Sequence, residues 1–187
     1  GGNHMASNTI IEKYPLYNLG ISGEEVERTL KNSAQKSDVD VLQERINKIK
    51  YYGDADIEIS PDEWFVFNDE EHTILGGFSE GHENETSIVI PYSVTTIGPE
   101  AFFGCSSLTS VIIPNSIVLI PPETFYGCSG LTSINIPDRI RSISMGAFDN
   151  CSSLTSITIG SGLRRLNGDA FDGCVSLTNI VVSSNNN

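Results

Sequence analysis

Apolar residues recur at a constant interval through the second half of the chain. Residues 86–108, 109–131, 132–154 and 155–177 repeat one pattern, and a fifth copy begins at Thr178 and stops after a few residues. The cysteines at positions 105, 128, 151 and 174 are each 23 residues apart, so no insertion interrupts the register. A constant period of this length predicts a solenoid, in which each copy forms one coil that is buried against its neighbours.

Each copy predicts one strand and one turn. Two apolar columns alternate with a variable residue, as in a strand with one buried face, and stacked coils would pair these strands in a parallel sheet about 4.8 Å apart. Proline ends the predicted strand in three copies, whereas Gly160 replaces it in the fourth, where we expect a looser corner. On the opposite side we expect a short helical or 3₁₀ turn, which a left-handed Gly or Asn stops before each cysteine. One column of the predicted core contains Phe102, Phe125, Phe148 and Phe171.

The N-terminal part has the spacing of helices. Ser22 and Glu25 form a capping box, and a second helix is expected from Ser37 to Gly53. Four apolar residues of this second helix follow the a/d seam of a coiled coil, but over fewer heptads than a secure coiled coil shows. A helix packed on its own domain and a self-associating stalk, such as a homotrimer, therefore both stay open. The seam residues are Val39, Leu42, Ile46 and Ile49.

Two short aromatic-rich strands precede the first coil. Residues 64–67 and 73–76 flank the turn NDEEH and predict a hairpin. A solenoid exposes an apolar end, so we expect this hairpin to cap the array. The resulting organisation is an expression-tag remnant at 1–7, a helical neck at 8–60, the capping hairpin at 61–85 and the repeat array at 86–187. Because the tag precedes everything else, the lack of a signal peptide does not decide the compartment.

Charge is unevenly distributed along the chain. The net charge is −13, and residues 1–85 carry 18 acidic and 7 basic residues against 6 and 4 in residues 86–187. An acidic surface of this kind repels phosphates, so we expect no nucleic-acid partner. No apolar run approaches about 18 residues, and we therefore expect no membrane insertion.

The sequence shows no pattern that carries catalysis, and we expect no enzyme, cofactor or metal. The cysteines lack close C-x-x-C pairs and are held one coil apart, so we interpret them as small buried packing residues. His72 and His82 lie in acidic loops without a motif, and the spaced carboxylates of residues 54–63 lack the order of an EF-hand. No nucleophile elbow, P-loop or dinucleotide-binding glycine pattern is present.

The repeat unit I-x-I-P-x-x-V-x-x-I-x-x-x-A-F-x-x-C-x-x-L-T-S resembles the BspA-like, Treponema pallidum-type class of leucine-rich repeats. The resemblance covers residues 86–187 and implies a curved solenoid. It also implies a non-catalytic adhesion protein, extracellular or at a cell surface, that binds protein or glycan. The expected fold is thus an α+β repeat: a leucine-rich-repeat solenoid with a parallel sheet on one face, an N-terminal helical segment and a hairpin cap.

A second resemblance lies upstream of the array. The segments LGISGEEVE and DVDVLQERINKI are similar to necks of tail-fibre proteins from phages and prophages. This similarity implies an alternative function, the receptor-binding tip of a virion tail, trimeric through residues 39–49. A structural spacer without a ligand is a further alternative.

The variable columns of the repeat are the candidate binding residues. Leucine-rich repeats commonly bind through the concave strand face, where we expect Val89, Ile112, Asn135 and Thr158, with Val181 in the partial copy. A second candidate site is cationic, because stacked guanidinium groups can bind a phosphate, sulfate or carboxylate. Ordinary surface, neutralised by Asp138, is the alternative. The four cations of the array are Arg139, Arg141, Arg164 and Arg165.

Overall fold

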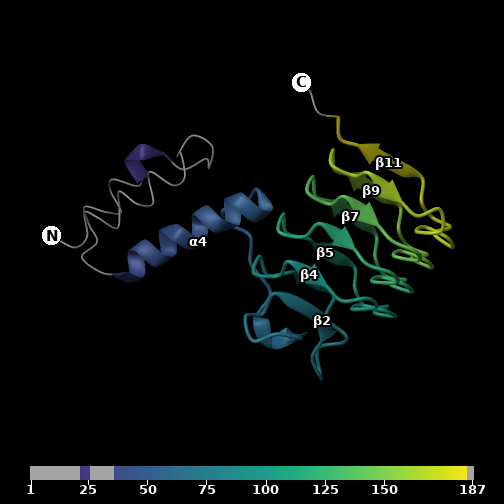
Figure 1. The fold of residues 1–187 in the computed structure, drawn as a ribbon, viewed down its shortest axis with the longest axis horizontal. Helices are drawn as coiled ribbons and strands as arrows, with labels where there is room; N and C mark the ends of the chain where they lie inside the picture. Colours follow the sequence, from purple (N-terminus) through teal and green to yellow (C-terminus); the bar gives the residue numbers. More distant parts are fainter. Residues whose placement is uncertain (1–21, 26–35, 185–187) are drawn as a thin grey trace. The chain divides into compact units, whose positions relative to one another are not determined.

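The computed structural model describes residues 22–25 and 36–184, and within the second range it describes side chains from residue 38 onward. The chain forms two compact units, Gly1–Ile57 and Glu58–Asn187, each of which is considered by itself. Figure 1 shows the helix of the first unit and the stacked coils of the second. The predicted tag remnant, residues 1–7, lies outside the described residues.

The first unit contains the helix α4 (Lys36–Tyr52). It begins one residue before the predicted start at Ser37 and ends, as predicted, at Gly53, which has a left-handed φ of 73° and donates to the carbonyl oxygen of Ile49 at 2.9 Å. The capping interaction predicted at the first helical start is also present, because the amide of Glu25 donates to Oγ of Ser22 at 3.0 Å. Local start and stop signals therefore predict the helical ends closely.

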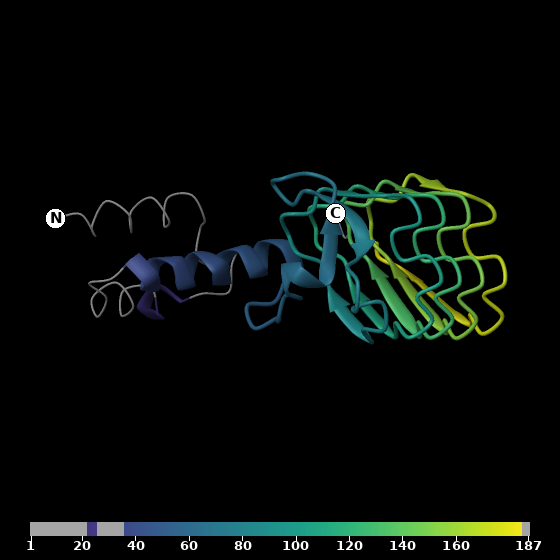
Figure 2. The same cartoon turned by 90° about the horizontal axis from the view of Figure 1, so that it is seen from below.

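The second unit is a solenoid with two rows of short parallel strands (Figures 1 and 2). The first row contains β3 (Ser87–Val89), β5 (Ser110–Ile112), β7 (Ser133–Ile136), β9 (Ser156–Ile159) and β11 (Asn179–Val182). The second row contains β4 (Thr96–Ile97), β6 (Leu119–Ile120), β8 (Ser142–Ile143) and β10 (Arg165–Leu166). Paired residues are 23 positions apart, as in Ile134 with Ile157. The sequence predicted the first row; the second, of two-residue strands, is too short for a recognisable alternation.

The side opposite the first row is built of hydrogen-bonded turns. Where a helical or 3₁₀ turn was predicted, the described coils have i→i−3 bonds, such as that from Phe103 to Glu100, without a regular helix. The predicted left-handed stop before each cysteine is confirmed, with φ between 58° and 71° at Gly104, Gly127, Asn150 and Gly173. Gly and Asn tolerate this conformation because their steric cost there is low.

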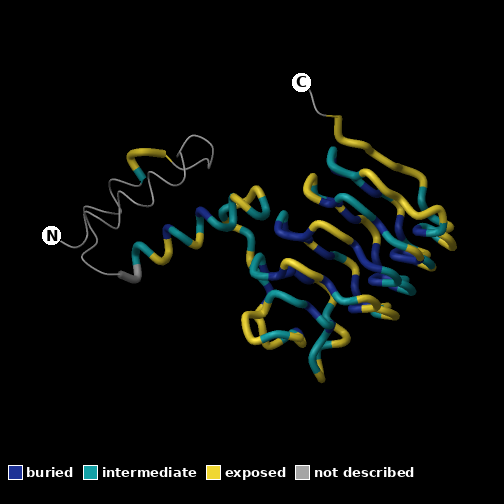
Figure 3. The backbone as a smooth tube through the Cα atoms, viewed as in Figure 1, coloured by how far each residue is buried: buried dark blue, intermediate teal, exposed yellow. Residues whose placement is uncertain are grey.

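The core of the solenoid consists of stacked identical side chains. Figure 3 shows the buried segments repeating on the inner side of each coil. The phenylalanine column forms a continuous ladder, with ring centroids 5.1, 5.6, 5.3 and 5.4 Å apart from Phe78 to Phe102, Phe125, Phe148 and Phe171. Burying each large apolar side chain contributes roughly 1.5–3 kcal/mol, so neighbouring coils stabilise one another.

The predicted hairpin is present and continues the solenoid. After the short 3₁₀ helix η1 (Asp62–Trp64), β1 (Phe65–Phe67) pairs antiparallel with β2 (Ile74–Phe78). Strand β2 also pairs in parallel with β4, and Phe78 contacts the ring of Phe102. The hairpin thus adds one strand to the second row and one ring to the ladder, and in this way covers the apolar N-terminal end.

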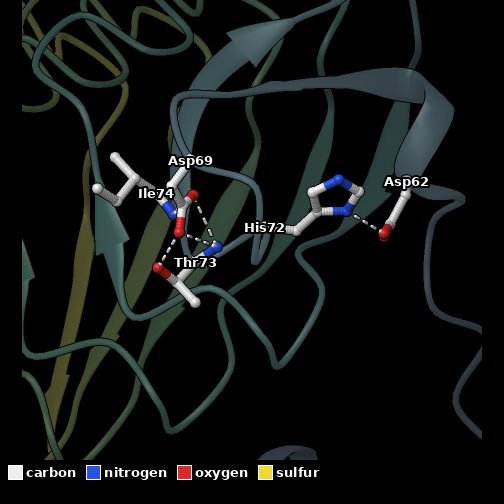
Figure 4. Close-up of polar contacts among 5 residues, drawn as sticks. All are labelled: Asp62, Asp69, His72, Thr73 and Ile74. Atoms are coloured by element: carbon white, nitrogen blue, oxygen red, sulfur yellow. Dashed lines mark hydrogen bonds and ion pairs between the residues drawn. The ribbon is translucent and has the colours of Figure 1, made fainter.

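The turn between β1 and β2 is organised by Asp69 (Figure 4). Its carboxylate accepts hydrogen bonds from the amides of Thr73 and Ile74, at 2.9 and 2.8 Å, and from the hydroxyl of Thr73. These bonds, that of the Thr73 hydroxyl first, lower the pKa of Asp69. His72 has a left-handed φ of 56°, stacks on Phe67 and lies 2.7 Å from Asp62. The contacts of Asp69 with Thr73 and of Asp62 with His72 therefore stabilise the hairpin. The sequence alone did not predict a function for these side chains.

Candidate functional site

The variable residues of the first strand row lie where the sequence predicted, with one exception. Ile112 and Asn135 are exposed, Thr158 is half-buried and Val181 is exposed. They occupy β5, β7, β9 and β11 at equivalent positions. Asn135 pairs with Thr158 and Thr158 with Val181, and Ile112 lies one repeat of 23 residues before Asn135. These four residues, the strand-face residues, form one row across four coils.

The predicted exposure of Val89 is wrong. Its side chain is buried, with 9% exposed. Ser60 explains this, because its amide donates to the carbonyl oxygen of Val89 and its hydroxyl accepts from the amide of Val89 at 2.8 Å. The segment before the hairpin therefore pairs with the free edge of β3. Nothing in the repeat pattern reveals this contact, since Ser60 lies outside the array.

Arg141, one of the four predicted anion-binding residues, is occupied by backbone. Its Nη1 donates to the carbonyl oxygens of Asp138 at 2.8 Å and of Gly162 at 3.2 Å. The guanidinium group thus joins coils three and four through Nη1. Arg139 is exposed, and its backbone amide donates to Oδ1 of Asn115.

Arg164 and Arg165 line a groove of about 640 Å³ on the second strand row. Both side chains are exposed. Their backbone amides donate to the carbonyl oxygen of Arg141, which fixes the strand without using the guanidinium groups. The groove is shallow and open to solvent. The other residues of the groove lie on and after β6, β8 and β10; they are Pro122, Ser142, Ile143, Ser144, Met145, Leu166 and Asn167.

The groove contrasts in charge with the rest of its unit. Residues 58–187 contain 15 acidic residues, and their only Lys and Arg residues are the four arginines of coils three and four. Within the described part of the chain, none of these arginines forms an ion pair. The nearby carboxylates are bound to backbone amides instead: Asp138 accepts from Ser161 and Asp169 from Gly146. Among the described residues, Asp138 therefore forms no ion pair with these arginines.

The cysteines form a packing column. Cys128 and Cys151 are fully buried, as predicted, whereas Cys105 and Cys174 are half-buried at the ends of the column. Each later thiol donates to a phenylalanine carbonyl oxygen of the preceding coil, for example from Cys128 to Phe102 at 3.2 Å. Burial raises the pKa of Cys128 to about 12. In the described ranges, no three His, Cys, Asp or Glu side chains are grouped as a metal site requires.

The predicted oligomerisation seam is partly covered within one chain. Leu42 and Ile46 are buried, with 3% and 0% exposed, whereas Val39 and Ile49 are half-buried. A homotrimer through this seam stays a prediction. Within residues 22–25 and 36–184, no helix has the length and apolarity that a membrane crossing needs.

Sequence reasoning missed the neutral residues of the groove. Ser142 and Arg165 share one column of the repeat, and Ser144 and Asn167 share another. These columns face solvent only because the second row of strands exists, which the sequence did not reveal. The signal that was available is the arginine pair itself, which breaks the repeat.

The BspA type leucine rich repeat region matches residues 77–187, in six copies. The chain belongs to this family. Its match begins at Gly77, within β2, which agrees with the role of the hairpin as part of the solenoid. As a BspA-type repeat protein it has the non-catalytic architecture of a repeat module, and proteins of this type are typically extracellular or at the cell surface.

Solved structures of bacterial repeat proteins resemble the chain. A leucine rich cell surface protein from Faecalibacterium prausnitzii is 36% identical, with 54% of this chain and 27% of that chain covered and a TM-score of 0.52. A leucine-rich repeat protein from Bacteroides ovatus is 28% identical, with 67% of this chain and 41% of that chain covered and a TM-score of 0.54. The T. pallidum leucine rich repeat protein is 19% identical, with 66% of this chain and 71% of that chain covered and a TM-score of 0.55. At this identity the likeness shows the fold alone.

The matched part spans less than half of the F. prausnitzii and B. ovatus chains. None of the curated proteins compared with the chain matches it. These likenesses concern repeat proteins, and they give no support to the tail-fibre resemblance of the neck.

Proposed function

We propose that this BspA-type protein is a recognition module that binds protein or glycan at a cell surface through its strand-face residues. The observation that carries the proposal is their placement. Asn135, Thr158 and Val181 are held in one parallel register, Ile112 has the same repeat position on β5, and the four side chains differ in chemistry. A rigid row of different side chains suits specific recognition of a partner, since little conformational entropy is lost when it binds.

The likeness to a cell surface protein supports the location of this function. The F. prausnitzii protein is 36% identical over the matched repeats and is a leucine rich cell surface protein. We infer an extracellular position for this chain as well. Adhesion to host or microbial surfaces is the activity that such a position and such a strand face serve.

The test is binding of the full chain to an array of extracellular proteins and glycans. A variant with Ile112→Asp and Asn135→Arg should lose the binding of the wild-type protein. The control variant carries Ser107→Asp and Ser129→Arg, on the turns after the cysteines, and should bind normally. Binding of both variants at wild-type level would refute the strand face as the site, and a wild-type protein without any ligand would favour a structural spacer.

A homotrimer is tested separately by sedimentation equilibrium of the same preparation. The tail-fibre alternative requires a trimer, so a strict monomer contradicts it. A trimer that Val39→Asp abolishes without a loss of helicity would assign the seam of α4 as its interface.

A further inference from the structure

We infer that the groove beside Arg164 and Arg165 is a second binding site, for an acidic saccharide that carries carboxylate or sulfate groups. The groove lies on the second strand row, whereas the strand-face residues lie on the first. Binding in the groove is therefore independent of binding by the strand-face residues. The groove is lined by two consecutive arginines and by a set of neutral polar residues.

The charge of the unit selects an anionic ligand. Every Lys and Arg of residues 58–187 lies in coils three and four, amid 15 acidic residues. Arg141 is bound to carbonyl oxygens, whereas Arg164 and Arg165 are exposed and form no ion pair among the described residues. Guanidinium groups match the planar fork of a carboxylate and the oxygens of a sulfate, so an unpaired couple is suited to either anion.

The remaining lining selects a sugar. Ser142, Ser144 and Asn167 provide hydroxyl and amide groups, which can donate to and accept from sugar hydroxyls. Met145 and Leu166 are 52% and 49% exposed, and they offer apolar surface for the C–H face of a sugar ring. A groove of about 640 Å³ has room for a short oligosaccharide. An acidic peptide could use the same arginines, and a peptide probe therefore has to be compared with the saccharides.

The strand geometry prepares the site before a ligand arrives. The amides of Arg164 and Arg165 both donate to the carbonyl oxygen of Arg141, and the amide of Asn167 donates to that of Ile143. The backbone under the groove is therefore fixed by neighbouring coils. Replacing the two arginine side chains leaves these bonds in place, which makes the site testable without unfolding the protein.

The experiment uses the full chain and isothermal titration with four probes. These are a heparin-derived hexasaccharide, a hexamer of galacturonic acid, neutral maltohexaose and a hexaglutamate peptide. We expect at least one acidic saccharide to bind, and maltohexaose and hexaglutamate to bind at least about tenfold more weakly. Tighter binding of the heparin fragment identifies sulfate as the preferred group, and tighter binding of the galacturonate hexamer identifies carboxylate.

Three variants locate the binding. Replacing both Arg164 and Arg165 by Ser should weaken saccharide binding by about tenfold or more, because each charged hydrogen bond contributes roughly a factor of ten. Arg139→Ser removes a charge from the same region without touching the groove and should change the affinity less than about twofold. The strand-face variant with Ile112→Asp and Asn135→Arg should bind as the wild type does, whatever becomes of the proposed function.

Several results would overturn the assignment. No binding of either acidic saccharide at about 1 mM would show that the groove is not a saccharide site. An equal loss in Arg139→Ser would show diffuse attraction of charge in place of a site. Binding of hexaglutamate as tight as that of the saccharides would assign an acidic protein segment instead.

Discussion

Arg141 and Gly162 are joined across two adjacent coils by a hydrogen bond of 3.2 Å from the guanidinium Nη1 to the carbonyl oxygen. A β-carbon at Gly162 would overlap both this Nη1 and the carbonyl oxygen of Asp138. At Gly160 a β-carbon would lie 2.6 Å from the amide nitrogen of Asp138. The corner predicted to be looser is therefore tight, because glycines allow coil four to approach the backbone of coil three.

Gly162→Ala should consequently destabilise the solenoid. The added methyl group has to displace Arg141 or the backbone at Asp138, and overpacking of this kind costs about 1–3 kcal/mol. Urea unfolding, followed by circular dichroism, measures the loss. Gly168→Ala is the matched control, since nothing lies within 4 Å of a β-carbon there. If the two variants unfold at the same urea concentration, the close approach at Gly162 does not contribute.

The phenylalanine ladder predicts that stability is greatest at its centre. Phe125 is fully buried, with stacked rings 5.6 and 5.3 Å away on its two sides, whereas Phe171 is half-buried and has one such neighbour. Phe125→Ala should lower the free energy of unfolding by about 3–5 kcal/mol. The same change at Phe171 should cost clearly less, and equal losses in the two urea unfolding curves would contradict this view of the ladder.

The regular parts of this fold follow from its sequence, and the contacts that break the repetition do not. The phenylalanine, cysteine and strand columns could be predicted because each position sees the same neighbours one coil away. Val89 could not, because its neighbour Ser60 comes from outside the repeat. In the same way, Arg141 occupies the same repeat position as Arg164, but its guanidinium group donates to the carbonyl oxygen of Gly162. This glycine corner occurs only in coil four.

The candidate site was partly predictable for a similar reason. The cationic cluster was visible as a departure from the repeat, but the groove depends on a second row of two-residue strands. Alternation over two residues carries no signal that a sequence can show. The first-row residues Ile112, Asn135 and Thr158 were predicted because a longer strand with a clear period contains them.

The four thiols should differ in reactivity according to their place in the column. Burial raises the pKa of Cys128 to about 12 and that of Cys105 to about 11. The interaction between the two neighbouring thiols raises the pKa of Cys151 and lowers the pKa of Cys174. Since the thiolate is the reactive form, Cys174, which is also half-buried, should be alkylated first.

Iodoacetamide labelling near neutral pH, read by peptide mass spectrometry, measures this order. Cys128 and Cys151 should be labelled only when the chain unfolds, because both side chains are fully buried. Labelling in concentrated urea is the control, in which all four thiols should react at similar rates. Rapid labelling of Cys128 in the folded protein would contradict its position in the core.

Asp69 should make the hairpin cap sensitive to acid. Hydrogen bonds from Thr73 and Ile74 hold the pKa of this half-buried carboxyl below its usual value of 3.8. A group with a lowered folded pKa stabilises the fold above its unfolded pKa, and this stabilisation is lost as the pH falls through the folded pKa. The free energy of unfolding of the wild type should therefore exceed that of Asp69→Asn above pH 3.8, and the difference should shrink below it.

Urea unfolding at a series of pH values measures this difference directly. Subtracting the Asp69→Asn curve removes the titration of the other carboxylates, which both proteins share. Glu71→Gln, which changes an exposed carboxylate of the same turn, is the matched control and should leave the free energy of unfolding unchanged. A difference between the wild type and Asp69→Asn that stays constant as the pH falls would show that the ionisation of Asp69 does not contribute to stability. The turn would then owe its stability to its backbone conformation and not to the charge of Asp69.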